Sequence, residues 1–97
     1  MHVISKKALV EFWNKHKDVE EVLKAWYKET EHAVWNGPSD IKQRYRSADF
    51  LAGNVVAFNI RGNNYRLIVK VNYNSRTVYI RFIGTHAEYD RINVEST

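Results

Sequence analysis

Two different spacings of hydrophobic residues follow one another along this chain, and the change falls near Asn54. Before that point, apolar residues recur at the spacing that puts them on one face of an α-helix. After it, apolar and polar residues alternate, which is typical of strands whose side chains point to opposite faces of a sheet. The pattern therefore predicts helices in the first half and an antiparallel sheet in the second.

The first half begins with a short apolar segment, residues 2–4, which we expect to form a strand. Ser5 follows where a hydroxyl can cap a helix, and helical spacing predicts that helix over Lys6–His16. Asp18 and Glu21 have the spacing of a capping box, so a second amphipathic helix should start there.

The second helix should end near Trp35, because Asn36-Gly37-Pro38 is a strong stop signal. Residues 39–53 carry a weaker pattern. We expect a structured linker there, with one or two helical turns over Ser39–Tyr45 and another over Ser47–Leu51.

Three alternating segments follow and predict a three-stranded antiparallel meander. Gly62-Asn63-Asn64 and residues 72–76 are its turns, because Gly and Asn tolerate a positive φ. A short last helix is expected over Ala87–Ile92.

Strand alternation sorts the sheet residues into two faces. The apolar face should hold Val56, Phe58, Ile60, Leu67, Val69, Val71, Val78, Ile80 and Phe82. The opposite face should hold Asn59, Arg61, Arg66, Lys70, Tyr79 and Arg81. Because both helices need an apolar partner, the sequence predicts an α+β fold in which an N-terminal helical pair packs on one face of a small twisted antiparallel sheet.

Composition narrows the class of protein. A chain of 97 residues that is 44% hydrophobic supports a single domain over residues 1–97 and excludes a disordered chain. It has no cysteine, which excludes disulfides, cysteine–zinc sites and thiol catalysis. Its four histidines show no metal-ligand spacing, so we expect no metal or other cofactor. With neither a secretory leader nor an apolar run of about 20 residues, we expect a cytoplasmic protein without membrane contact.

The charge distribution points to an anionic partner. The net charge is +4, but the stretch from Phe50 to Ala87 holds no acidic residue while it carries five Lys and Arg. Like charges facing each other across a sheet destabilise it, so a sheet face with four cations and a tyrosine favours a phosphate-rich ligand. The alternative is an ordinary solvated sheet face.

The segment Gly84-Thr85-His86-Ala87-Glu88-Tyr89-Asp90 follows the last strand and brings chemistry to that face. His86 can exchange a proton near neutral pH, and Tyr89 can exchange one or stack on a base. Arg66 can stabilise the extra charge on a phosphate under attack. These groups suffice for RNA cleavage without a metal, in which the 2′-hydroxyl attacks its own phosphate. His86 as a capping residue and Tyr89 as a core residue remain the alternatives, so the residues alone indicate a basic RNA-binding domain and leave ribonuclease activity open.

Three segments of the sequence resemble the HigB toxins of bacterial type II toxin–antitoxin systems, within the RelE/ParE-like superfamily: Met1–Leu9, Phe58–Leu67 and Tyr79–Asp90. The resemblance implies a microbial-RNase-like fold and an mRNA interferase that cleaves messages on translating ribosomes. It also implies a HigA-type helix-turn-helix antitoxin, with which the toxin forms a hetero-oligomer.

The resemblance also suggests roles for single residues. Arg66 matches the arginine that RelE-like toxins place against the scissile phosphate, His86 the basic residue after the last strand, and Tyr89 the C-terminal tyrosine. The lysines of RelE are replaced here by Ala57 and Asn59, so its acid–base roles do not transfer, and we favour His86 for proton transfer. The expected RNA-binding residues are Asn59, Arg61, Asn63, Lys70, Tyr79 and Arg81. A domain that binds RNA or the ribosome without cleavage, and a ParE-like toxin that blocks gyrase, are the competing hypotheses.

Overall fold

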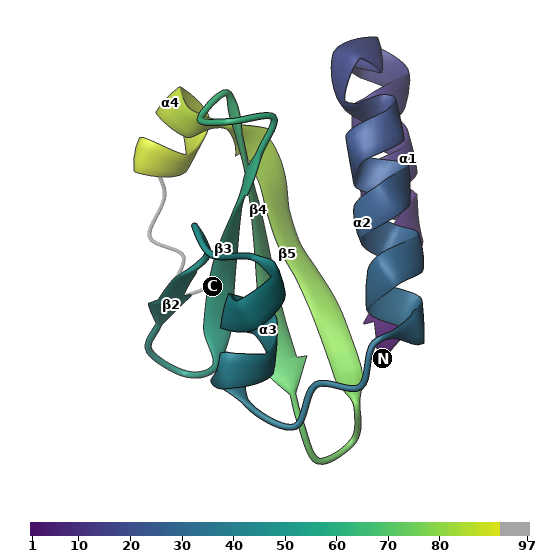
Figure 1. The fold of residues 1–97 in the computed structure, drawn as a ribbon. Helices are drawn as coiled ribbons and strands as arrows, with labels where there is room; N and C mark the ends of the chain where they lie inside the picture. The colour runs from purple at the N-terminus through teal and green to yellow at the C-terminus, as the bar shows by residue number, and fades with distance from the viewer. Residues whose placement is uncertain (92–97) are drawn as a thin grey trace.

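The computed structural model describes residues 1–91, in which helices and a sheet form two layers (Figure 1). The elements in chain order are β1 (His2–Ile4), α1 (Lys6–Lys15), the 3-10 helix η1 (Lys17–Val19), α2 (Glu20–His32), α3 (Pro38–Arg44), β2 (Asp49–Leu51), β3 (Val55–Ile60), β4 (Tyr65–Asn72), β5 (Thr77–Thr85) and α4 (His86–Asp90). None of the helices among these residues is long and apolar enough to cross a membrane.

The sheet has five strands in the order β1-β5-β4-β3-β2. The predicted meander forms its centre as β3, β4 and β5, each antiparallel to the next. Two short strands extend it: β1 pairs with β5 in parallel, and β2 pairs with β3 antiparallel. The predicted α+β class is confirmed, with the difference that β1 makes the sheet mixed.

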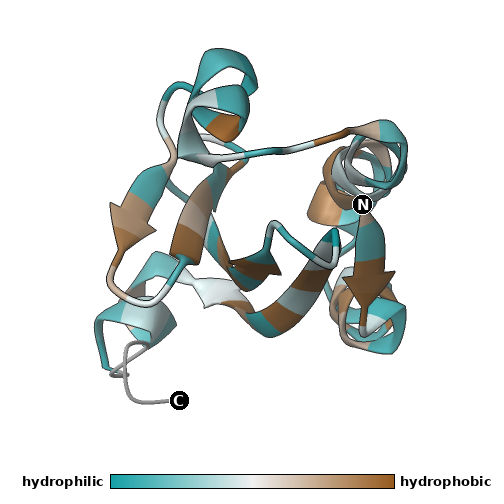
Figure 2. Ribbon diagram, turned by 90° about the horizontal axis from the view of Figure 1, so that it is seen from below, coloured by the Kyte–Doolittle hydropathy of each residue, from teal (hydrophilic) through white to brown (hydrophobic). Residues whose placement is uncertain are grey.

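The hydrophobic core lies between the sheet and the helical pair, which stands on one side of it (Figure 1). In Figure 2 the helical pair is seen nearly end-on, and both helices carry brown hydrophobic segments next to teal hydrophilic ones. The buried side chains include Leu9, Trp13, Leu23, Trp26, Trp35, Phe58, Leu67 and Val71. Burial of a side chain such as Leu or Phe contributes about 1.5–3 kcal/mol to the stability of the fold. The helical pair therefore packs on the face of the sheet that carries these side chains, and the opposite face stays uncovered by the pair.

The start of the second helix differs from the prediction. Asp18 lies within η1, and α2 begins at Glu20 without a side-chain cap, so the predicted capping box is absent. The carboxylate of Asp18 instead accepts hydrogen bonds from Arg61 and Tyr65. The helix also ends earlier than predicted, at His32.

The linker contains more structure than the sequence indicated. Pro38–Arg44 forms the helix α3, as one of the expected helical turns. The helical turn expected over Ser47–Leu51 is wrong, because Asp49–Leu51 is extended and pairs with Val55–Ala57 as β2. At the other end of the chain α4 covers His86–Asp90, while Ile92 of the predicted last helix lies outside the described residues.

A β-bulge in β5 changes which side chains face the core. Val69 pairs with Ile80 and Ile68 pairs with Phe82, so the β4–β5 register shifts by one residue at Arg81. An extra residue in a strand reverses the alternation beyond it. Phe82 was expected on the core face, but it packs against a second apolar cluster of Val55, Ala57 and Ile68.

Candidate functional site

The face of the sheet opposite α1 and α2, here called the open face, brings the predicted catalytic residues together. In the sheet register Arg66 of β4 lies between Asn59 of β3 and Gly84 of β5. The chain continues from Gly84 into α4, which lies on the other side of the sheet from the helical pair (Figure 1). Strand pairing therefore puts Asn59, Arg66 and the start of α4 side by side.

Arg66 is a buried cation at the centre of this group, with 8% of its surface exposed. Its Nη2 donates to Oδ2 of Asp49 at 2.7 Å. Its guanidinium carbon lies 4.7 Å from the ring centroid of Tyr89, in a cation–π contact. Within residues 1–91, Nε and Nη1 are buried and have no hydrogen-bond partner. The guanidinium is thus held in place by one carboxylate and one aromatic ring.

Asp49 is a functional candidate that the sequence reasoning missed. It directly precedes the acid-free stretch, in the segment for which the sequence predicts only a structured linker. Only the pairing of Asp49 with Ala57 in β2–β3 brings its carboxylate onto the open face. The local sequence contained no sign of this pairing, because β2 has only three residues.

A capping box fixes the start of α4. The backbone N–H of Glu88 donates to Oγ1 of Thr85 at 3.1 Å, and the N–H of Thr85 donates to Oε1 of Glu88 at 2.9 Å. The hydrogen bond from the Thr85 backbone holds the pKa of the Glu88 carboxyl below its usual value. This cap orients the first turn of α4, so that the His86 and Tyr89 rings lie edge to face with centroids 6.2 Å apart.

A hydrogen-bond chain through Asn59 favours one tautomer of His86. The Nδ2 of Asn59 donates to the carbonyl of Ser47 at 3.2 Å, so its Oδ1 faces His86. Oδ1 is an acceptor, and it lies 3.3 Å from Nε2 of His86. A neutral ring that donates from Nε2 matches this acceptor and has its lone pair on Nδ1.

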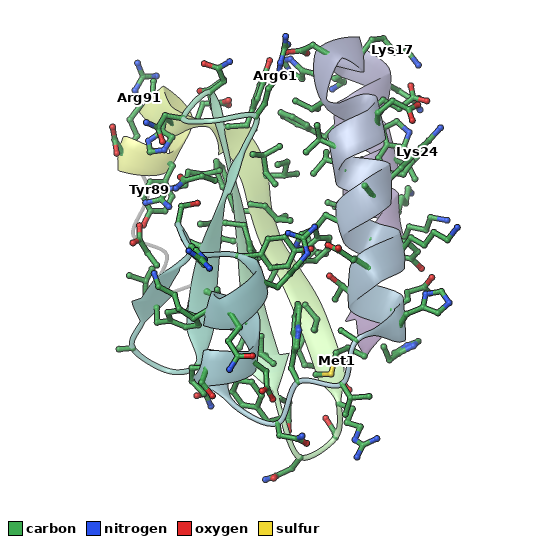
Figure 3. The ribbon with its side chains drawn as sticks, in the orientation of Figure 1. Met1, Lys17, Lys24, Arg61, Tyr89 and Arg91 are labelled. Atoms are coloured by element: carbon green, nitrogen blue, oxygen red, sulfur yellow. The ribbon has the colours of Figure 1, made fainter. Side chains whose placement is uncertain are left out.

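Arg61 does not lie on the open face, so the predicted patch of four cations is wrong. It occupies the β3–β4 turn with a φ of 53°, after the regular alternation of β3 has ended. Its Nη1 forms an ion pair with Oδ2 of Asp18 at 2.8 Å. Figure 3 shows Arg61 at the tip of this hairpin, towards Lys17, whereas Tyr89 lies at α4. Asn63 is exposed in the same turn.

The remaining predicted RNA-binding residues lie along β4 and β5. Lys70 and Tyr79 face each other across the two strands, and both are exposed. Lys70 is four positions from Arg66 in the strand, or about 13 Å at the usual rise. Arg81 occupies the bulge. The open face thus has Arg66 at one end and an exposed Lys70–Tyr79 pair at the other.

The fold and this site define a class. A helical pair on one face of a small sheet, with arginine, histidine and tyrosine meeting on the other face, is consistent with the RelE-like toxins. Residues 1–91 contain no group of three or more His, Asp or Glu side chains that could hold a metal ion.

Comparison with known proteins specifies the family. Residues 19–92 match the HigB toxin family, described as the RelE-like toxic component of a toxin–antitoxin system. The mRNA interferase toxin HigB of Escherichia coli strain K12 is 32% identical over 93 residues, which cover 93% of this chain and 88% of that protein. The mRNA interferase HigB of Escherichia coli O6:H1 is 27% identical over 94 residues, which cover 95% of this chain and 91% of that protein. The chain belongs to the HigB toxin family.

Proposed function

We propose that the chain, acting as one domain, is an endoribonuclease that cleaves mRNA and thereby arrests growth. Two HigB relatives that it resembles over nearly their whole length are named mRNA interferases. The observation that carries the proposal is that Arg66 and His86 both lie next to the ring of Tyr89. Tyr89 lies 4.7 Å from the Arg66 guanidinium and 6.2 Å, between centroids, from the His86 imidazole.

In the proposed reaction the RNA supplies its own nucleophile. Nδ1 of His86 accepts the proton of a ribose 2′-hydroxyl, and the 2′-oxygen attacks the adjacent phosphorus. The bond from phosphorus to the 5′-oxygen breaks, and that oxygen takes a proton from the hydroxyl of Tyr89. The products are a 2′,3′-cyclic phosphate and a 5′-hydroxyl end, and solvent returns the two proton carriers to their starting forms.

Arg66 and Asn59 support this step in different ways. The phosphate gains negative charge as the 2′-oxygen attacks, and the fixed Arg66 cation stabilises that charge without having to reorganise. Asn59 holds Nε2 of His86 by the hydrogen bond described above, so Nδ1 stays available for proton transfer. Asn59 is therefore a positioning residue in this proposal, in addition to its expected contact with RNA.

We further propose that ribosome-bound messages in the cytoplasm are the substrate and that a HigA-type helix-turn-helix antitoxin neutralises the toxin in a hetero-oligomer. Membership of a toxin–antitoxin family supports an antitoxin partner. The exposed Lys70–Tyr79 pair offers a cation and an aromatic ring to an RNA strand that extends beyond the scissile phosphate.

Induced expression followed by mapping of the 5′ ends of messages tests the function. We expect growth arrest together with new 5′-hydroxyl ends. Arg66→Ala and His86→Ala should each abolish both effects, whereas Arg76→Ala, which removes an exposed arginine of the β4–β5 turn, should not. Growth arrest with intact messages would refute the nuclease proposal and favour a binding or gyrase-blocking toxin.

The purified protein tests the mechanism. An RNA oligonucleotide should be cleaved in the presence of EDTA, while the same oligonucleotide with 2′-deoxy sugar at the cleaved position should remain intact. Cleavage of the deoxy-substituted strand at that position would exclude attack by the 2′-hydroxyl.

A further inference from the structure

We infer that Asp49 is an internal competitor of the substrate: in the free protein its carboxylate occupies the position on Arg66 that an RNA phosphate must take. The inference deepens the proposed function and rests on it for the identity of the phosphate. It assigns a role to a residue outside the set predicted from the sequence.

The surroundings of Arg66 leave one nitrogen of its guanidinium, Nη2, for an incoming phosphate to bind. Nε and Nη1 are buried, and the Tyr89 ring lies over the guanidinium. Nη2 is the nitrogen with a bound anion, the carboxylate of Asp49 at 2.7 Å. A phosphate that binds Arg66 in this arrangement therefore has to take over Nη2.

The two partners of this ion pair differ in exposure, and the difference determines which one can leave. The Arg66 side chain is 10% exposed and that of Asp49 is 55% exposed. A buried guanidinium without an anion is strongly unfavourable, whereas an exposed carboxylate is readily hydrated. Replacement of the carboxylate by a phosphate therefore keeps Arg66 neutralised throughout and releases Asp49 into water.

The backbone around Asp49 is fixed, which lets the carboxylate return when the phosphate leaves. Asp49 is paired with Ala57 in the sheet. The preceding residues are tied down as well, because Asn59 donates to the carbonyl of Ser47 and Lys42 donates to that of Ala48 at 3.0 Å. Only the side chain of Asp49 has to rotate for the exchange.

Anion binding measured without any cleavage tests the inference. The probes are inorganic phosphate and a single-stranded DNA oligonucleotide, which lacks 2′-hydroxyls, with titrations by calorimetry at constant ionic strength. Asp49→Asn keeps the shape of the side chain and removes its charge. We expect it to bind both probes about tenfold more tightly than the wild type, the size of one lost charge-assisted contact.

Two variants separate competition from a general change in charge. Glu11→Gln changes the net charge equally at an exposed position on α1 and should alter affinity less than about twofold. In the double variant Asp49→Asn/Arg66→Gln the gain should disappear. Equal affinities for Asp49→Asn and Glu11→Gln, or a gain that persists without Arg66, would overturn the inference.

A measurement on the wild type avoids dependence on how well the variants fold. The carboxyl ¹³C resonance of Asp49 should shift as phosphate saturates the protein, while that of Glu11 stays in place. An Asp49 resonance that does not respond to saturating phosphate overturns the inference. Failure of the nuclease proposal gives a different result, namely tighter anion binding by Asp49→Asn together with a wild type that cleaves no RNA.

Discussion

Replacement of Gly84 by alanine tests whether the packing between β5 and α4 holds the site together. A Cβ atom at this position would lie 2.5 Å from Cζ of Phe82 and 3.1 Å from Oε1 of Glu88. Ordinary contacts between carbon atoms are about 3.5–4.0 Å, so both neighbours would have to move. Phe82 belongs to the second apolar cluster, and Glu88 closes the capping box of α4.

The expected loss follows from the cost of forcing extra atoms into a packed site. Such overpacking costs about 1–3 kcal/mol. In a domain of this size 1 kcal/mol shifts Tm by about 4–8 °C, so Gly84→Ala should melt about 5–20 °C below the wild type. Thermal unfolding followed by circular dichroism measures this. Because α4 carries His86 and Tyr89, cleavage of RNA at a temperature where the variant is folded should fall as well.

Gly37→Ala is the matched control, because a Cβ at Gly37 has nothing within 4 Å. Its φ of −171° is extended backbone that alanine adopts without strain. We expect the free energy of unfolding to change by less than about 0.5 kcal/mol, as at most surface positions. If Gly84→Ala melts within about 2 °C of Gly37→Ala, the close contact does not constrain the fold and the reasoning is refuted.

Three further predictions concern the site and its supports. Asn59→Ala should lower kcat about tenfold while the thermal stability stays unchanged. The variant should also allow both neutral tautomers of His86, which the ¹⁵N chemical shifts of the ring measure. A His86 ring that keeps its proton on Nε2 in the variant would contradict the role of Asn59. Burial raises the pKa of the Asp18 carboxyl, but hydrogen bonds from Tyr65 and Arg61 and the charge of Arg61 together outweigh burial and hold this pKa below its ordinary 3.8. The contribution of Asp18 to stability is therefore present at neutral pH and is lost as the pH falls below that value. Asp18→Asn should therefore reduce stability at pH 7 more than at pH 3 in urea unfolding, and an equal effect at both would exclude the ion pair as the cause. Glu88→Gln should speed amide hydrogen exchange in α4 at pH 7 while exchange in α2 stays the same, since the carboxylate both accepts the Thr85 N–H and lies at the positive end of the helix.

The sequence predicted well what depends on regular periodicity. Alternation in β3 and β4 put Asn59 and Arg66 on the open face, and helical spacing put Trp13 and Trp26 in the core. Gly62 marked the β3–β4 turn because glycine adopts a positive φ without strain, and Pro38 marked the start of α3 because its ring fixes φ. These signals are local, so they can be read without knowledge of the fold.

The errors arose where distant parts of the chain meet. Asp18 has the spacing of a helix cap, but two hydrogen bonds from the β3–β4 hairpin engage its carboxylate. Asp49 reaches Arg66 only because a three-residue strand finds an edge of the sheet. The bulge at Arg81 leaves no mark in the alternation that precedes it. Each depends on a long-range pairing that spacing along the chain does not reveal.

The extra residue in β5 is compatible with a shorter version of this strand. Deletion of Arg81 would make Ile80 and Phe82 direct neighbours opposite Val69 and Ile68, so simple pairing between β4 and β5 would be restored. Because neighbouring strand residues point to opposite faces, Phe82 would stay on the open face and Ile83 on the core face. The start of α4 would therefore keep its place, and the architecture is compatible with the loss of this one residue.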